Sequence, residues 1–183
     1  MFSEKNFYFL GVLAALATVT IWAAFLIGTR FAVSGNLSVD EVLILRLVPA
    51  FLIMLPLMFK LGILIKGQSV FSLLMIALGA TAIFPYLIST GVYYAPASDA
   101  GALAPGMLPF WTALFAFLII GEKPSKIRLI GLLIILLGAF LVGSYSILSP
   151  SDQNTWKGHF LFLAGSAMWS VYSVYFRKSG INP

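Results

Sequence analysis

The sequence contains no cysteine and a single histidine, His159, among its 183 residues. Without thiols the chain can form no disulfide, no thiolate metal site and no cysteine nucleophile, and one histidine supplies no cluster of imidazole ligands. A glycine-rich phosphate loop ending in lysine and a pair of catalytic carboxylates are also missing from the sequence. We therefore expect that this chain is not an enzyme and that it binds no metal or cofactor.

Charged residues are scarce as well. They make up 9% of the chain, against roughly 25% in soluble domains, whereas 61% of the residues are hydrophobic. The net charge of +5 does not indicate nucleic acid as a partner, because the 11 Lys and Arg residues stand at the ends of apolar runs and form no basic cluster. This composition predicts an integral membrane protein whose main partner is the lipid bilayer.

The few charges divide the chain into stretches long enough to cross a membrane, since a spanning helix needs about 20 apolar residues. Five stretches carry no charge, and a sixth carries only Arg46. We predict an all-α membrane protein with about six transmembrane helices, over residues 6–29, 42–59, 67–98, 100–121, 129–151 and 158–176.

Local signals mark several helix ends. Ser38 followed by Glu41 is typical of a capping box at the start of the second span. Gly121 is placed to end the fourth span, and Ser125 to cap the fifth. Small residues of the fifth span favour close packing against a neighbouring helix: Gly131, Gly138 and Gly143.

The basic residues also predict an orientation. If the N-terminus is cytoplasmic, eight of them lie on the inner side and only Arg30 and Lys157 on the outer side. The first apolar stretch is too long for a cleaved signal peptide. We expect a multi-pass protein of the cell inner membrane with both ends cytoplasmic. The inner residues are Lys5, Lys60, Lys66, Lys123, Lys126, Arg128, Arg177 and Lys178.

A partial internal repeat appears when the chain is shifted by 147 residues. The sixth span then matches the first, and because five spans separate the copies, the two run in opposite directions. Inverted repeats are typical of transporters. We predict a first five-helix repeat at 1–147 and the start of a second at 148–183. The matches are Gly11 with Gly158, Leu16 with Leu163, Ala17 with Ala164, Trp22 with Trp169, and Arg30 with Arg177.

The chain resembles the EamA-type branch of the drug/metabolite transporter superfamily. This resemblance implies a ten-helix fold of 5+5 inverted repeats that exports or exchanges small metabolites, amino acids or drugs, with the missing half supplied by further chain or by a homodimer partner. Ala23 departs from the family pattern, which commonly has glycine there. The residues that carry the resemblance are Trp22, Arg30, Arg46, Tyr93-Tyr94-Ala95, the run from Ala100 through Pro109 to Gly121-Glu122, Gly131 and Gly138.

The fourth span contains a predicted helix break. Pro105 and Pro109, with Gly106 between them, remove helical hydrogen bonds and leave carbonyl groups free. Such a break is tolerated where it lines a cavity, or where neighbouring helices satisfy the carbonyls. Both interpretations stay open, and Pro105 and Pro109 are candidate cavity residues.

Two charged residues and one histidine each allow two interpretations. Arg46, inside a span, is expected either to face the interior, where a substrate carboxylate is one candidate partner, or to extend to the outer interface. Asp99 is either a charge or proton site, or a favourable acid in the first turn of a helix. His159 is either a polar residue at the interface or a proton relay.

Aromatic residues complete the candidate site. They are candidates either for an aromatic substrate cavity or for the interfacial belt and packing. The inverted repeat and the broken fourth span favour a secondary transporter that moves a small-molecule substrate by alternating access. Its midplane cavity is built from the first, third and fourth spans, with Trp22, Tyr86 and the Pro105–Pro109 break in the lining and Arg46 contributing charge. The alternative is a non-transporting assembly or interaction subunit, or an inactive truncated form. The aromatic candidates are Trp22, Tyr86, Tyr93, Trp111 and Trp169.

Overall fold

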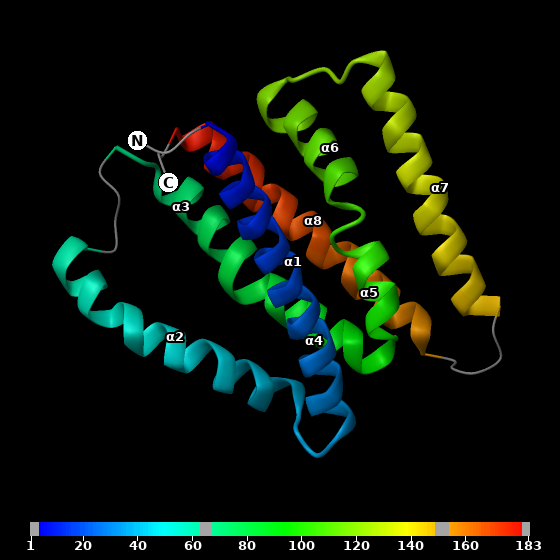
Figure 1. Cartoon of the computed structure of the whole chain (residues 1–183), viewed down its shortest axis with the longest axis horizontal. Helices are drawn as coiled ribbons and strands as arrows, with labels where there is room; N and C mark the ends of the chain where they lie inside the picture. Colours follow the sequence, from blue (N-terminus) through cyan, green and yellow to red (C-terminus); the bar gives the residue numbers. More distant parts are fainter. Residues whose placement is uncertain (1–3, 63–66, 149–153, 181–183) are drawn as a thin grey trace.

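The computed structural model describes residues 4–62, 67–148 and 154–180. Lys66 and residues 149–153, both in predicted connections, lie outside these ranges. The described residues form a bundle of helices (Figure 1). Its elements are α1 (Glu4–Ser34), α2 (Val39–Leu61), α3 (Val70–Ala77), the π-helical turn η1 (Leu78–Ala82), α4 (Ile83–Tyr94), α5 (Ala97–Leu103), α6 (Leu108–Ile120), α7 (Lys126–Leu148) and α8 (Thr155–Ser179).

Within the described residues, 5 helical stretches are long and apolar enough to cross a membrane. One of them combines α3, η1 and α4, and another combines α5 and α6, so these correspond to the predicted third and fourth spans. The predicted sixth span is α8, which has 25 residues but is less apolar than the others. The protein is therefore an all-helical membrane protein. The five stretches are Tyr8–Ser34, Val39–Lys60, Val70–Tyr94, Ala97–Ile120 and Lys126–Tyr145.

The lower hydropathy of α8 follows from its place in the bundle. It packs against α3, η1, α4, α5, α6 and α7, so neighbouring helices replace much of its contact with lipid. Every fourth residue along one face is buried, as expected for a row of side chains on a helix. Polar side chains are tolerated on this face because partners lie beside them. The row consists of Gly158, Phe162, Ser166, Ser170 and Val174.

The directions of the helices follow from Figure 1. The start of α1 and the end of α8 lie at the same end of the molecule, so these two helices run in opposite directions. Two contacts are made by the last residues of α8 at this end of the molecule. Gln68 Nε2 donates to the carbonyl of Ser179 at 2.9 Å, and Arg177 pairs with Glu122 in the α6–α7 connection. Gln68, just before α3, and Glu122, between α6 and α7, therefore lie on the same side of the bundle.

Arg30 marks the opposite side. Its Nη1 donates to the carbonyl of Val92 and, at 2.9 Å, to that of Tyr93. These carbonyls belong to the last turn of α4, where helical partners are missing and the helix dipole is negative. The guanidinium thus caps α4 and joins the end of α1 to it.

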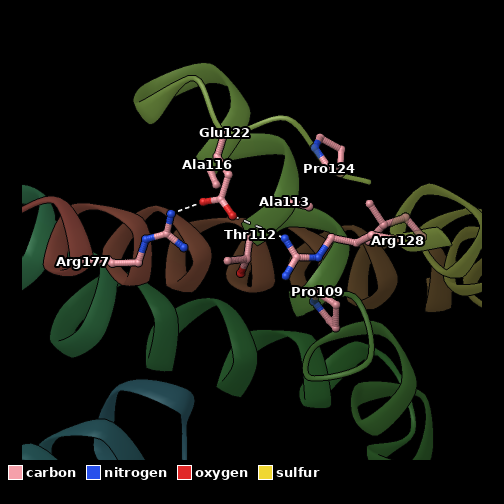
Figure 2. A pocket seen from close by; sticks show the side chains of 9 residues that line it. Pro109, Thr112, Ala113, Ala116, Glu122, Pro124, Arg128 and Arg177 are labelled. Atoms are coloured by element: carbon pink, nitrogen blue, oxygen red, sulfur yellow. Dashed lines mark hydrogen bonds and ion pairs between the residues drawn. The ribbon is translucent and has the colours of Figure 1, made fainter. Parts of the chain in front are cut away.

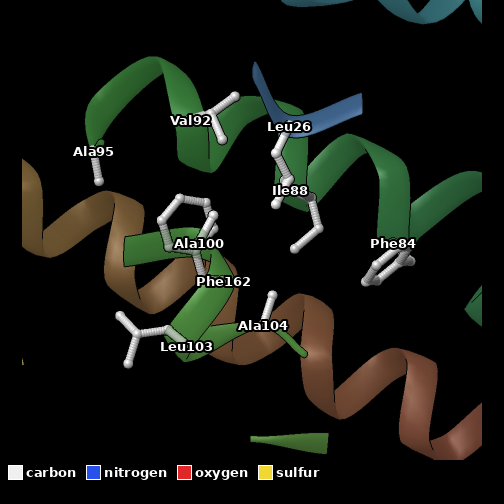
Figure 3. Packing of buried hydrophobic residues seen from close by; sticks show 9 residues of the cluster. All are labelled: Leu26, Phe84, Ile88, Val92, Ala95, Ala100, Leu103, Ala104 and Phe162. Carbon is white, nitrogen blue, oxygen red and sulfur yellow. The ribbon is translucent and has the colours of Figure 1, made fainter. Parts of the chain in front are cut away.

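The hydrophobic core lies between α4, α5 and α8, with one residue of α1 (Figure 3). Phe162 of α8 is fully buried, and Ile88 and Val92 of α4 lie beside it in the same cluster. α2 and α7 lie at the periphery and expose large apolar side chains over most of their length. This distribution is expected for helices that face hydrocarbon.

Glycines allow α4 and α8 to approach closely. A Cβ on Gly91 would collide with the ring of Phe162, and one on Gly158 would lie 2.8 Å from the carbonyl oxygen of Gly91. The glycines predicted to pack closely were those of the fifth span, and that prediction is wrong for the described residues. A Cβ on Gly131, Gly138 or Gly143 would meet nothing within 4 Å.

The predicted helix ends are confirmed. Ser38 caps α2, with its backbone N–H donating to Glu41 Oε2 at 2.7 Å and its hydroxyl accepting from the Glu41 N–H. Gly121 ends α6 in the left-handed conformation with φ 80°. The Ser125 hydroxyl accepts from the N–H of Arg128 at 3.3 Å in the first turn of α7.

Candidate functional site

The helix break predicted in the fourth span separates α5, which ends at Leu103, from α6, which begins at Leu108. The carbonyl of Ala104 accepts a hydrogen bond from Ser166 Oγ of α8 at 2.7 Å. A Cβ on Gly106 would collide with the carbonyl of Ala102, so this turn requires glycine. A neighbouring helix thus satisfies a carbonyl that the break leaves free.

Ser170 continues this pairing one turn further along α8. Its hydroxyl donates to the carbonyl of Leu108 at 3.5 Å and accepts from Thr112 Oγ1 at 3.2 Å. The fourth span is therefore joined to α8 by polar contacts on the α6 side of its break. Such contacts are stable within a membrane because every polar group involved has a partner.

Three aromatic rings meet where α1, α4 and α8 converge. The ring centroids of Trp22 and Trp169 lie 5.5 Å apart in a T-shaped arrangement, and Phe84 lies 4.7 Å from Trp169 and 5.8 Å from Trp22. These separations are typical of favourable aromatic pairs. The two tryptophans that the shifted alignment matches are thus in contact.

Arg46 of α2 lies next to these rings. Its guanidinium carbon is 3.7 Å from the ring centroid of Phe25, within cation–π distance. Arg46 makes no ion pair with any residue that the structure describes. A pocket of about 200 Å³ opens here, and its walls include no acidic residue. Its lining residues are Ile21, Trp22, Phe25, Arg46, Ala80, Phe84, Pro85 and Trp169.

The other predicted cavity residues lie outside this pocket. Tyr86 and Tyr93 of α4 are exposed, and Tyr93 packs edge-on against Tyr94. Trp111 stacks on Phe115 within α6, and its buried indole N–H has no hydrogen-bond partner among the residues that the structure describes. Pro105 lies in the break of the fourth span, and Pro109 lies in the first turn of α6 directly after it. The pocket is therefore built from the first, second and third spans and α8, without the fourth.

Asp99 and His159, which share no local sequence pattern, form a polar pair. His159 Nε2 lies 2.8 Å from Asp99 Oδ2, and the two side chains are 7% and 15% exposed. Asp99 is in the first turn of α5 and His159 in the first turns of α8, so the contact joins the two helices. Their separation of 60 residues left no local signal of this pairing.

A second pocket, of about 220 Å³, is lined by Glu122, Arg128 and Arg177 (Figure 2). Arg177 is near the end of α8, whereas His159 is near its start, so this pocket lies away from the Asp99–His159 pair. Glu122 points between two arginines there, pairing with Arg177 of α8 and, at 3.4 Å, with Arg128 of α7. The hydrogen bond and charge of Arg177, and to a smaller extent Arg128, lower the pKa of Glu122 from its ordinary value of 4.5. Arg128 is only six residues from Glu122 in the chain, whereas Arg177 is 55 residues away. Pro109 contributes to the wall of this pocket.

The fold and the pockets define a multi-span membrane protein with one cationic aromatic pocket inside its helices. In the described parts of the chain, no group of three His, Asp or Glu residues is placed to hold a metal ion. The family model of the EamA-like transporter family matches residues 9–144, which include α2 to α6 and most of α1 and α7. The chain belongs to this family, and it is a membrane transporter. No curated protein and no solved structure matches it.

Proposed function

We propose that the protein is a secondary transporter that exports or exchanges small metabolites, amino acids or drugs by alternating access. In this proposal, 1–147 is the first five-helix repeat and 148–183 begins the second, inverted repeat of a ten-helix fold. The protein resides in the inner membrane with its N-terminus in the cytoplasm. The observation that carries the proposal is the contact of Trp22 with Trp169 at the wall of the Arg46 pocket.

The geometry of α1 and α8 supports this proposal. These helices run antiparallel, and their matched tryptophans meet between them. The matched arginines act at opposite ends of the bundle: Arg30 caps the third span, and Arg177 holds Glu122 at the end of the fourth. Transporters with inverted repeats place their substrate sites at the interface between the repeats. The Arg46 pocket occupies a corresponding position between α1 and α8.

The test is flux through liposomes that contain the full-length native polypeptide. Uptake is measured for labelled amino acids, small organic acids and a cationic dye. We expect saturable uptake of at least one of these solutes. For that solute, Trp22→Ala, Arg46→Ala and Pro109→Ala should each lower the rate by about tenfold, because each alters the pocket or the helix break.

Gly138→Ala is the matched control, because a methyl group there meets nothing within 4 Å among the described residues. It should leave the rate unchanged. Wild-type rates in all three site variants would contradict the assignment of the site. Absence of flux, together with co-purification of a stoichiometric partner protein, would instead support a non-transporting assembly subunit.

A further inference from the structure

We propose that the Arg46 pocket binds a small organic anion, namely a carboxylate that carries one apolar or aromatic group. The transport of this anion rests on the function proposed above, whereas its binding is tested separately. This pocket contains a positive charge that lies inside a membrane span. Arg46 lies in α2, seven residues after the helix begins at Val39, and therefore about 10 Å along the helix axis.

A cation at this depth requires compensation. Ionised side chains within membrane spans are costly, and they pair with one another or face water-filled cavities. Among the described residues Arg46 has no acidic partner, and Glu41, an acid of the same helix, is engaged in the capping box with Ser38. Arg46 is exposed at the pocket, so its charge is accessible to a solute that enters. Because Arg46 has no acidic partner among the described residues, the ligand that compensates its charge should be an anion.

The side chain does not extend toward the membrane surface. Its guanidinium lies over Phe25, which is nine residues, or about 14 Å of helix, before the end of α1 at Ser34. An arginine that extended to the outer interface would contact the last two turns of α1 instead. The structure therefore favours the inward-facing interpretation of Arg46 over the interfacial one.

A cationic substrate is disfavoured at the same place. Aromatic rings attract cations, but the face of Phe25 is already occupied by the guanidinium of Arg46. A second cation in a pocket of about 200 Å³ would lie close to this guanidinium and be repelled in a medium of low dielectric constant. The planar, forked guanidinium instead matches a carboxylate with two parallel hydrogen bonds.

The remaining walls determine the rest of the ligand. Trp22, Phe84 and Trp169 present rings, and the pocket is smaller than typical sites for drug-sized molecules. A ligand with one carboxylate and one short apolar or aromatic group would place its charge on Arg46 and its apolar group against these rings. Large or multiply charged solutes do not fit this arrangement.

The test is calorimetric titration of the full-length native polypeptide in lipid nanodiscs. The probes are phenylacetate, 3-phenylpropionate and 4-methylvalerate, each compared with its neutral amide, and the cation phenethylamine. We expect at least one acid to bind about tenfold or more tightly than its amide, because the hydrogen bonds to the charged group are lost in the amide. Phenethylamine should bind no more tightly than the amides.

Variants of Arg46 test whether this residue causes the preference for an acid over its amide. Arg46→Gln should remove the difference between acid and amide, and Arg46→Lys should keep part of it, because lysine retains the charge without the fork. Lys60→Gln, in the last turn of the same helix, should leave the preference intact. If no acid binds more tightly than its amide in the wild-type protein, the inference is wrong. It is equally wrong if folded Arg46→Gln keeps the preference.

The flux assay separates this inference from the proposed function. Binding that depends on Arg46 and favours acids, in a protein that moves none of the probes, would support the anion site and contradict transport of these anions. Flux of neutral or cationic solutes, with no preference for acids in the titration, would support transport and overturn the anion site.

Discussion

Serine hydroxyls on α8 provide the polar contacts that hold the broken fourth span. Ser166 and Ser173 lie on the same helix but serve different acceptors. Ser166 Oγ donates to the carbonyl of Ala104 in another helix, whereas Ser173 Oγ donates at 2.9 Å to the carbonyl of Trp169, four residues earlier in α8 itself. The first hydrogen bond joins two spans, whereas the second lies within α8.

Ser166→Ala should therefore destabilise the protein by about 1–2 kcal/mol, because the fully buried hydroxyl disappears and the carbonyl of Ala104 loses its partner. Ser173→Ala is the matched control and should change the free energy of unfolding by less than about 0.5 kcal/mol, since back-bonding within a helix adds little. Denaturant-induced unfolding in mixed micelles measures both values. Equal losses in the two variants would contradict the special role of Ser166.

The role of a single residue can be predicted from the sequence when it depends only on the neighbouring residues. The sequence identified Arg46 as an unusual cation because the apolar run around it is visible in the sequence. It could not pair Asp99 with His159, because the contact depends on how α5 and α8 pack. The same holds for Arg177 and Glu122, which lie 55 residues apart. Partners across helices are set by tertiary packing, which no short pattern encodes.

At the scale of helices, the close approach of α4 and α8 depends on residues without side chains. Gly91 lies against the ring of Phe162, and Gly158 lies against Ala95 and the backbone of α4. Small residues at such positions let dispersion contacts and backbone proximity replace the hydrophobic effect, which is absent between helices in lipid.

Gly91→Ala and Gly158→Ala should each destabilise the protein by about 1–3 kcal/mol, the usual cost of overpacking. Gly131→Ala in α7 should be neutral or stabilise the protein by up to about 1 kcal/mol, because alanine is the better helix former and the added methyl group meets nothing within 4 Å. Thermal unfolding of the three variants in the same detergent tests this. Destabilisation by Gly131→Ala comparable to that of Gly158→Ala would show that α7 packs closely after all.

Elements with a signature in consecutive residues were predicted well. The capping box at Ser38 and the glycine end at Gly121 were visible because each depends on a few neighbouring residues. The prediction that the glycines of α7 pack closely against a neighbour is wrong for the described residues. A pattern of small residues shows that close packing is possible, but it does not show which helix provides the partner. The sequence predicts a span over 158–176 but does not show that α8 lies at the centre of the bundle, because its contacts with six other elements depend on tertiary packing.

At the scale of the whole molecule, the Glu122–Arg177 pair ties the first five spans to α8 at one end of the bundle. Because Arg177 lowers the pKa of Glu122 in the folded protein, the pair contributes stability above the ordinary pKa of 4.5. This contribution is lost as the pH falls through the lowered pKa of the folded state. The charges are exposed, so salt should weaken the pair.

We therefore expect the wild-type protein to have a higher Tm than Glu122→Gln at pH 6, with a difference that shrinks steadily as the pH falls below 4.5. Arg177→Gln should remove more of this pH dependence than Arg128→Gln, because Arg177 makes the larger contribution to the lowered pKa. Thermal unfolding across this pH range, at low and at high salt, provides the measurement. A difference that stays constant with pH would assign the role of Glu122 to packing.

The orientation in the membrane is the broadest prediction, and the composition of the chain makes it easy to test. Because the sequence has no cysteine, each single-cysteine variant carries only one thiol. Asn36 lies exposed between α1 and α2, and Lys123 lies exposed between α6 and α7, at the end marked by Glu122 and Arg177. The excess of lysine and arginine at that end predicts that it faces the cytoplasm. A membrane-impermeant maleimide should label Asn36→Cys in intact cells, and should label Lys123→Cys only after the membrane is opened. The reverse pattern would invert the orientation, and labelling of both sites in intact cells would contradict an odd number of spans between them.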